Sequence, residues 1–248
     1  MSWLPIDQTN ELIVFARIAD REARSDLAGG YIQSEDDYTS NFTGALRRII
    51  NSNSKTGLTA TSFLLSSPNE RMTGTDAAII ITRQDQSKVA LFEAKWPRFS
   101  QKQYSWDYAQ TATGLSHFSD QLVRQGPWEK RFAVFEMFYC EWAFHQQPAY
   151  MHPEASSCVW HADAHHFMQR RTNPDVIWTQ DELKAMLRQG FVGIDKILLP
   201  FCECQKAEIL DIRDLKIIIN QFPLPRQVLA VSGDKGRKSE ELHRAIEF

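Results

Sequence analysis

Cysteine is scarce in this chain of 248 residues, which has only four: Cys140, Cys158, Cys202 and Cys204. Secreted domains that depend on a disulfide framework carry a much denser set. The sequence therefore excludes that class of protein. Its cysteines remain available as metal ligands or as small buried apolar side chains.

Long apolar runs are also missing. No run approaches the roughly 20 residues that cross a bilayer. The first residues, MSWLPIDQTNELIVF, lack the basic region and apolar core of a secretory signal. We therefore expect a cytoplasmic protein with no membrane partner.

An excess of positive charge is absent as well. The 28 Lys and Arg residues are outnumbered by 31 Asp and Glu, which gives a net charge of −3 and a pI near 6.2. Phosphate neutralisation supplies most of the non-specific affinity for nucleic acid. A generally basic nucleic-acid-binding protein is therefore disfavoured, and a nucleic-acid substrate would need a local patch of positive charge.

Apolar periodicity predicts an α/β protein in which helices alternate with short strands. Helices are predicted over residues 7–28, 36–50, 103–124 and 179–189. In the last of these, Thr179 is a candidate N-cap with Glu182 three residues later, as in a capping box. Strands are predicted over residues 58–66, 76–82, 89–96 and 131–142, with another beginning near Val159.

The second half of the chain is harder to interpret. The apolar runs at 194–202 and 215–219 are short enough for buried strands. No internal repeat or clear linker is present, so we expect one domain over residues 1–248. It would have a core at 35–142, a C-terminal extension at 143–231 and a charged tail at 232–248.

One stretch has a pattern typical of catalysis. It contains Gly74-Thr75-Asp76, then sixteen residues, then Glu93-Ala94-Lys95. Asp76 begins one apolar strand, and Glu93 and Lys95 lie near the end of the next. Residues two apart on a strand point to the same face, and a hairpin would bring Asp76 opposite them. Two carboxylates and an ammonium would then meet on an otherwise apolar sheet.

Two close carboxylates form a hard oxygen site that suits Mg²⁺ or Mn²⁺. The ion would stabilise charge on a phosphate and lower the pKa of a bound water, and Lys95 would orient that water or neutralise the transition state. The alternative is an ordinary ion pair between Glu93 and Lys95, with Asp76 as a turn residue. The apolar strands on both sides of the turn favour catalysis.

The order of helix, hairpin with Asp76 and Glu93-x-Lys95, helix and strand resembles the PD-(D/E)XK, or restriction-endonuclease-like, nuclease superfamily over residues 35–142. The resemblance implies a restriction-endonuclease-like core with a mixed sheet flanked by helices, and Mg²⁺-dependent hydrolysis of phosphodiester bonds. It also implies that Asp76, Glu93 and the Ala94 carbonyl bind the metal and that Lys95 is the catalytic lysine. Thr75 replaces the proline of the superfamily's name, which is a frequent departure.

The resemblance implies two further roles. Many members take another metal-binding acid from ahead of the hairpin, and Glu35 and Glu70 are the candidates here, although an acid at a helix start more often stabilises the helix dipole. Some members place a glutamine on the following helix. Gln121 is the first candidate and Gln110 the second, with a solvated polar face as the alternative.

Substrate binding would require positive charge beside this site. Arg98, Lys102 and Arg124 are the candidates for it. Aromatic residues interleave with them and would let bases stack, although core packing is their commoner use. These are Trp96, Phe99, Tyr104, Trp106 and Tyr108. The resemblance favours DNA as the substrate, and it leaves RNA, a homodimer and a partner protein open.

A second group of residues has the chemistry of a zinc site. It consists of Cys158, His161, His165, Cys202 and Cys204. Its Cys-x-Cys spacing is not the usual two-residue gap, which weakens the prediction. Two alternatives to a nuclease therefore stay open: a catalytically inactive nuclease fold that acts as a binding module, and a zinc-stabilised interaction protein.

Overall fold

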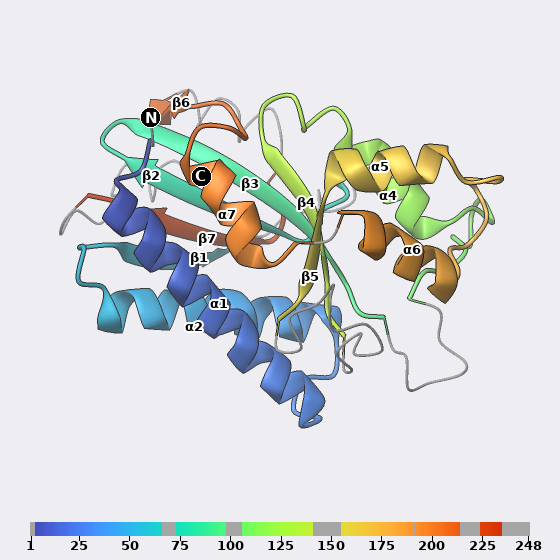
Figure 1. Cartoon of the computed structure of the whole chain (residues 1–248), viewed down its shortest axis with the longest axis horizontal. Helices are drawn as coiled ribbons and strands as arrows, with labels where there is room; N and C mark the ends of the chain where they lie inside the picture. Colours follow the sequence, from blue (N-terminus) through green and yellow to red (C-terminus); the bar gives the residue numbers. More distant parts are fainter. Residues whose placement is uncertain are drawn as a thin grey trace.

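The computed structural model describes residues 3–65, 73–97, 106–140, 155–190, 192–213 and 224–234, which form an α/β fold around one mixed β-sheet (Figure 1). Its seven strands are β1 (Thr59–Leu64), β2 (Ala77–Arg83), β3 (Gln86–Lys95), β4 (Ala133–Phe138), β5 (Ser157–Trp160), β6 (Leu210–Asp211) and β7 (Gln227–Ser232). The strand order is β1-β7-β2-β3-β4-β5, and β6 pairs with β3. The central β2–β3 hairpin is antiparallel, whereas β7 runs parallel to β2 and β4 runs parallel to β3.

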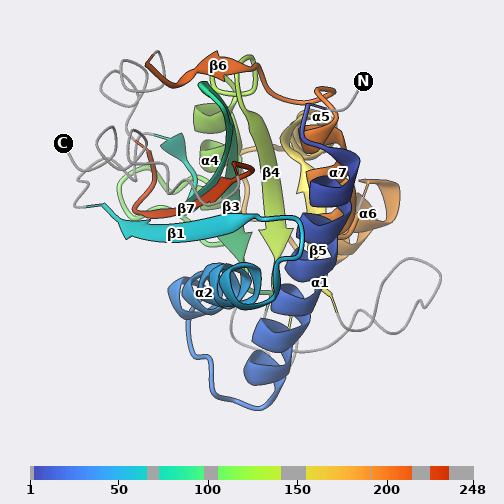
Figure 2. The ribbon, with the colours of Figure 1, turned by 90° about the vertical axis from the view of Figure 1, so that its left-hand side faces the viewer.

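Six helices accompany the sheet in the described ranges: α1 (Ile6–Ala28), α2 (Glu35–Asn53), α4 (His117–Gln125), α5 (His161–Gln169), α6 (Gln180–Gly190) and α7 (Ile194–Cys202). Helix α1 packs against α2 and α7, and α2 packs below β1 (Figure 2). Helices α4, α5 and α6 gather at the end of the sheet formed by β4 and β5 (Figure 1). None of the helices in these ranges is long and apolar enough to span a membrane.

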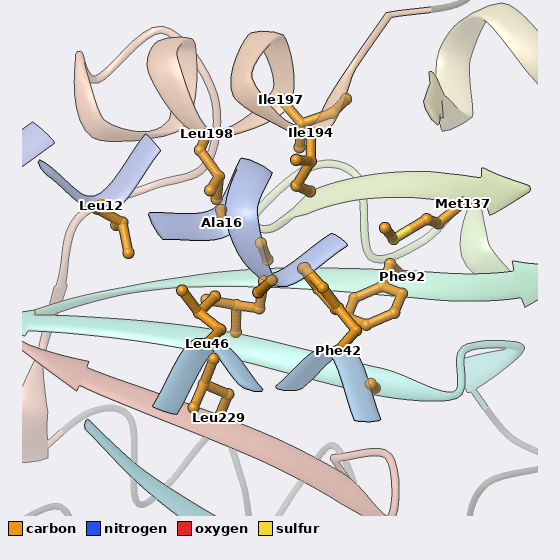
Figure 3. Close-up of a cluster of buried hydrophobic side chains, with 14 of the residues drawn as sticks. Leu12, Ala16, Phe42, Leu46, Phe92, Met137, Ile194, Ile197, Leu198 and Leu229 are labelled. Carbon is orange, nitrogen blue, oxygen red and sulfur yellow. The ribbon is translucent and has the colours of Figure 1, made fainter. Parts of the chain in front are cut away.

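Every second residue of the central strands faces α1, α2 and α7. In β3 these are Ala90, Phe92 and Ala94, as a side-chain period of two requires. Phe42 and Leu46 of α2 are completely buried on the same side (Figure 3). Burying a large apolar side chain contributes about 1.5–3 kcal/mol. This core therefore fixes the hairpin from one side.

The opposite face of the strands carries two smaller apolar clusters. Ile80 and Leu91 belong to the first, and Phe118 of α4 packs with Phe138 of β4 in the second. Along β3 the next residue after Leu91 on this face is Glu93, which is also buried. The apolar surface thus gives way to charge where α4 covers the sheet.

Most of the predicted elements are confirmed within a few residues. Helices α1, α2 and α6 match three predicted helices, and strands β1 to β5 match the predicted strands. The capping box of α6 is present: Glu182 Oε2 accepts from the Thr179 N–H at 2.7 Å, and the Glu182 N–H donates to Thr179 Oγ1 at 3.2 Å. The predicted run 215–219 and residues 235–248 of the predicted tail lie outside the described residues.

The helix predicted over residues 103–124 was wrong in its first half. In the described part of that range, residues 106–116 form turns and a bridge between Ala109 and Ser116, and the helix begins only at His117. Gly114 has a φ of +71°, which is incompatible with an α-helix. The Ser116 side chain accepts the Ser119 N–H at 3.0 Å and so caps the shorter helix.

The strand expected at 194–202 was also wrong, because this segment is helix α7. Ile194, Ile197, Leu198 and Phe201 recur at helical spacing, and all four are buried. Strand β7 had not been predicted, although it lies between β1 and β2. The sheet therefore takes strands from both the predicted core and the predicted extension.

Candidate active site

Glu93 and Lys95 lie at the end of β3 and point to the same face of the sheet. Lys95 Nζ donates to Glu93 Oε1 at 2.5 Å, and the two residues are only 4% and 1% exposed. Charged groups are costly in such a place unless they are paired or bind a metal. The two charges are therefore held together where water has little access.

Asp76 stands directly before β2 and meets the end of β3. Its N–H donates to the Phe92 carbonyl at 2.9 Å, and its Oδ2 accepts the Ala94 N–H at 2.7 Å. The antiparallel register pairs Ala77 with Phe92, which places Asp76 opposite Glu93. The hairpin thus brings both carboxylates and Lys95 together, as the sequence predicted; their chemical roles remain predictions.

Burial and neighbouring negative charges act on both carboxyl groups. The pKa of Asp76 is raised to about 6, chiefly by burial, against the opposing attraction of Lys95. Burial, followed by the charge of Asp76, raises the pKa of Glu93 well above its usual range. For Lys95, burial lowers the pKa, but the charges of Glu93, Glu35 and Asp76 outweigh it and raise the pKa overall. A cation between the carboxylates would relieve this repulsion.

Gln121, on α4, reaches the same carboxylate. Its Nε2 donates to Glu93 Oε1, the oxygen that also accepts from Lys95. Glu93 Oε2 and Gln121 Oε1 are buried and have no hydrogen-bond donor among the described residues. Buried acceptors normally find a donor, so this pair is suited to a cation or a bound water.

The second glutamine candidate, Gln110, lies in the turn before α4. Its backbone carbonyl accepts the Gly114 N–H at 2.8 Å, and its side chain accepts from Thr113 at 3.0 Å. The helical face that was to align Gln110 with Gln121 does not exist, because the helix begins later. The structure brings Gln121, the first candidate, to the acidic residues.

Helix α4 is held in place by a buried aspartate. The Asp107 carboxylate accepts the Ser116 hydroxyl at 2.7 Å and the backbone N–H groups of Phe118 and Trp178, each at 2.9 Å. It thereby joins the start of α4 to the segment before α6. This arrangement fixes the position from which Gln121 reaches the site.

Gly74 lies at a close contact between α4 and the segment that leads into the hairpin. Its φ is +67°, and a Cβ added there would meet the Gln121 carbonyl oxygen at 2.9 Å. Its own carbonyl accepts from Gln125 Nε2 at 2.6 Å. The glycine therefore lets α4 lie directly against the segment that leads to Asp76.

We expect Gly74→Ala to reduce thermal stability more than the matched control Gly114→Ala. Both glycines have a positive φ, which costs a residue with a Cβ about 1–2 kcal/mol. Only at Gly74 would the new Cβ also collide with backbone, since nothing lies within 4 Å at Gly114. Thermal unfolding of the two variants measures the difference. Equal losses would contradict the close packing of α4.

A further row of buried polar side chains was not predicted. Glu136 of β4 pairs with Glu93 in the parallel register and is completely buried. Gln125 Nε2 lies 3.3 Å from Glu136 Oε2, and Gln125 Oε1 lies 2.9 Å from His161 Nδ1. His161 Nδ1 is also 3.8 Å from Glu136 Oε1. The buried polar network thus continues from the hairpin to α5.

Two features of the sequence would have revealed this row. Glu136 interrupts the apolar strand AVFEMF, as Glu93 interrupts VALFEAK. Gln125 follows Gln121 by four residues and so shares its helical face. His161 carried no such signal, because it was grouped with the zinc candidates.

The remaining candidates differ in where they lie. Glu35 Oε1 accepts the Trp96 N–H at 2.8 Å, just after Lys95, so Glu35 is close to the site. Arg124 Nε pairs with Asp120 Oδ2 at 2.9 Å along α4. Three other candidates lie outside the described residues: Glu70, Arg98 and Lys102.

The zinc candidates form no metal site in the described ranges. There, no group of three or more His, Cys, Asp or Glu side chains is arranged to hold a metal ion. Cys158 and Cys202 are buried in a strand and a helix, whereas Cys204 is exposed. The zinc hypothesis therefore gains no support from the geometry.

No family model matches the chain, and no curated protein or solved structure is significantly similar to it. The chemistry of the site is therefore inferred from its own residues. Those residues are two adjoining carboxylates, a paired lysine and a glutamine, all gathered at the end of one hairpin.

Proposed function

We propose that this protein is a metal-dependent nuclease with a restriction-endonuclease-like core, and that it hydrolyses phosphodiester bonds at the site of Asp76, Glu93 and Lys95. The observation that carries the proposal is the surroundings of Glu93. One of its oxygens accepts from both Lys95 and Gln121, and the other is buried without a donor in the described residues, with Asp76 opposite. A structural ion pair needs neither a second carboxylate nor an unsatisfied acceptor.

Asp76 and Glu93 would hold a Mg²⁺ or Mn²⁺ ion, with the Ala94 carbonyl as the third ligand that the family resemblance implies. Glu35, whose carboxylate lies close to the site, is the candidate for a further acidic ligand. Mg²⁺ needs few protein ligands, since it keeps several waters and bridges to phosphate. When bound, such an ion lowers the pKa of a coordinated water and neutralises charge on the phosphate.

Lys95 would act as a cationic donor. Its raised pKa keeps the ammonium protonated at neutral pH, so it is suited to stabilising negative charge on a phosphoryl or leaving oxygen rather than to removing a proton. Gln121 would orient Glu93 through the hydrogen bond from its Nε2. Arg124, Arg98 and Lys102 are proposed to bind phosphates on either side of the scissile bond, with DNA as the favoured substrate.

The proposal is tested by incubating the purified protein with plasmid, linear duplex DNA, single-stranded DNA and RNA, each in Mg²⁺, Mn²⁺ or EDTA. We expect cleavage of at least one of these nucleic acids in the presence of a divalent cation and none in EDTA. Absence of metal-dependent cleavage in all four would refute the proposal.

We expect Gln121→Ala to lower turnover about 10- to 100-fold, the usual cost of losing a residue that orients a metal ligand. Substituting a solvent-exposed glutamine would not lower the stability of the protein, but Gln121 is only 6% exposed. We therefore also expect a loss of about 1–3 kcal/mol, because the hydrogen bond goes to a charged group. Gln110→Ala is the matched control and should change neither quantity; equal effects of the two variants would remove Gln121 from the site.

A further inference from the structure

Two of the aromatic candidates, Trp106 and Tyr108, differ in burial, whereas Phe99 and Tyr104 lie outside the described residues. Trp106 is buried and makes edge-to-face contacts with Phe118, Phe138 and Trp178. Its role is core packing. Tyr108, two residues later, is 56% exposed. Of these two, Tyr108 alone is placed to touch a ligand.

Tyr108 is held as one half of a stacked pair. Its ring lies on the His117 ring with centroids 4.4 Å apart and planes 16° apart. The His117 N–H donates to the Tyr108 carbonyl at 2.9 Å, which ties the two backbones together at the start of α4. Because His117 covers one ring face and Tyr108 is largely exposed, the other ring face is accessible.

Helix α4 places the stacked pair beside the candidate active site: His117 begins the helix, and Gln121, one turn later, donates to Glu93. Burial raises the pKa of the Tyr108 hydroxyl, and the charges of Lys95, Glu35 and Glu93 also act on it. Burial, then Lys95 and Arg124, lower the pKa of His117 to about 4. His117 is therefore neutral at physiological pH, and the pair presents an uncharged aromatic surface at the start of α4.

We propose that the Tyr108–His117 pair binds an unpaired nucleobase of single-stranded nucleic acid next to the phosphate that is cleaved. This inference rests on the proposed nuclease function and assigns its substrate class. Stacking on an aromatic side chain is worth about 1–3 kcal/mol per base and tolerates any sequence. In a duplex both faces of an internal base are already stacked, so single strands and unpaired ends would be preferred.

The charge of the chain supports the same choice. With a net charge of −3, the chain has no general excess of positive charge to neutralise phosphates. Two carboxylates at the site also weaken the attraction for the phosphate backbone. A stacked base would supply affinity that does not depend on positive charge.

The test compares Tyr108→Leu with Tyr108→Phe on single-stranded DNA, single-stranded RNA and duplex DNA of the same sequence. We expect Tyr108→Leu to raise KM for single strands about 5- to 100-fold with kcat little changed, which is the loss of one stacked base. Tyr108→Phe should behave like the native protein, and KM for duplex should not change. Tyr31→Leu, at another exposed tyrosine (83%), is the matched surface control. The two single-stranded substrates show whether DNA or RNA is bound.

A binding experiment separates this inference from the nuclease proposal. A single-stranded oligonucleotide with a fluorescent base analogue is titrated with protein in EDTA, where stacking on Tyr108 should quench the fluorescence. Quenching that Tyr108→Leu abolishes and Tyr108→Phe retains supports the stacking site, even if no nucleic acid is cleaved. If the native protein cleaves, and Tyr108→Leu has the same KM and the same quenching as the native protein, the stacking site is overturned. The nuclease proposal then still stands. Failure of the native protein both to bind and to cleave overturns both.

Discussion

Asp76→Asn should raise the thermal stability of the metal-free protein at about pH 7.5, where the carboxylate is ionised. In the folded chain the pKa of Asp76 is about 6, above its ordinary value of 3.8, so ionisation opposes folding. Below pH 3.8, the ordinary pKa that applies in the unfolded chain, the protonated carboxyl makes its full contribution to the free energy of unfolding. That contribution is lost as the pH rises through about 6. Asn cannot ionise, yet its side-chain oxygen can still accept the Ala94 N–H. We expect a gain of about 1–3 kcal/mol, towards the lower figure because Asp76 is only partly buried.

Thermal unfolding in EDTA across the acidic to neutral range measures this gain, which should vanish at the acid end. Mg²⁺ should then raise the Tm of the native protein but not that of Asp76→Asn, because a ligand stabilises only the state that binds it. A lower Tm for Asp76→Asn at neutral pH would show that the carboxylate is a stabilising ion partner instead.

Lys95→Met should abolish cleavage and destabilise the protein by about 3–5 kcal/mol, because it leaves a buried carboxylate without its cation. Glu93 would retain the Gln121 donor but no positive charge. Adding Glu93→Gln to Lys95→Met should restore most of the stability, since no buried charge is then unpaired, while cleavage stays absent. Urea unfolding of the single and double variants gives the coupling energy.

The matched control for this pair is the other buried lysine of β3. Lys88 Nζ donates to the Phe201 carbonyl on the side of α7, and no carboxylate forms an ion pair with it in the described part of the chain. Lys88→Met should therefore be additive with Glu93→Gln. If Glu93→Gln/Lys95→Met still cleaved nucleic acid at the native rate, the ion pair would be purely structural.

The hairpin and its three charged residues were predictable because the information is local. Apolar runs, a polar turn and a period of two place Asp76, Glu93 and Lys95 together without reference to the rest of the fold. The contact of Gln121 was also anticipated, although its helix was drawn too long. Gly114 and the N-cap Ser116 would have given the true start of α4, had the glycine been taken as a helix breaker.

The remaining features depend on contacts between distant segments. Strand β7 enters the sheet beside β2 although well over a hundred residues separate them, and an isolated apolar run does not reveal its neighbours. Likewise, the alignment of Glu136 with Glu93 follows from the register of two parallel strands, which the intervening α4 segment determines. The helical period of α7 was present in the sequence, but its shortness favoured a strand.

The measurement that tests the central claim most directly is the cleavage rate of native protein and Asp76→Asn, prepared identically and assayed with the same nucleic acids in Mg²⁺, Mn²⁺ and EDTA. We expect native protein to cleave only with a divalent cation, and Asp76→Asn to be inactive although it is folded and at least as stable. Gly114→Ala, whose added Cβ would meet no atom within 4 Å, should remain active. Cleavage by Asp76→Asn at the native rate, or none by the native protein with either cation, would contradict catalysis by the Asp76–Glu93–Lys95 site.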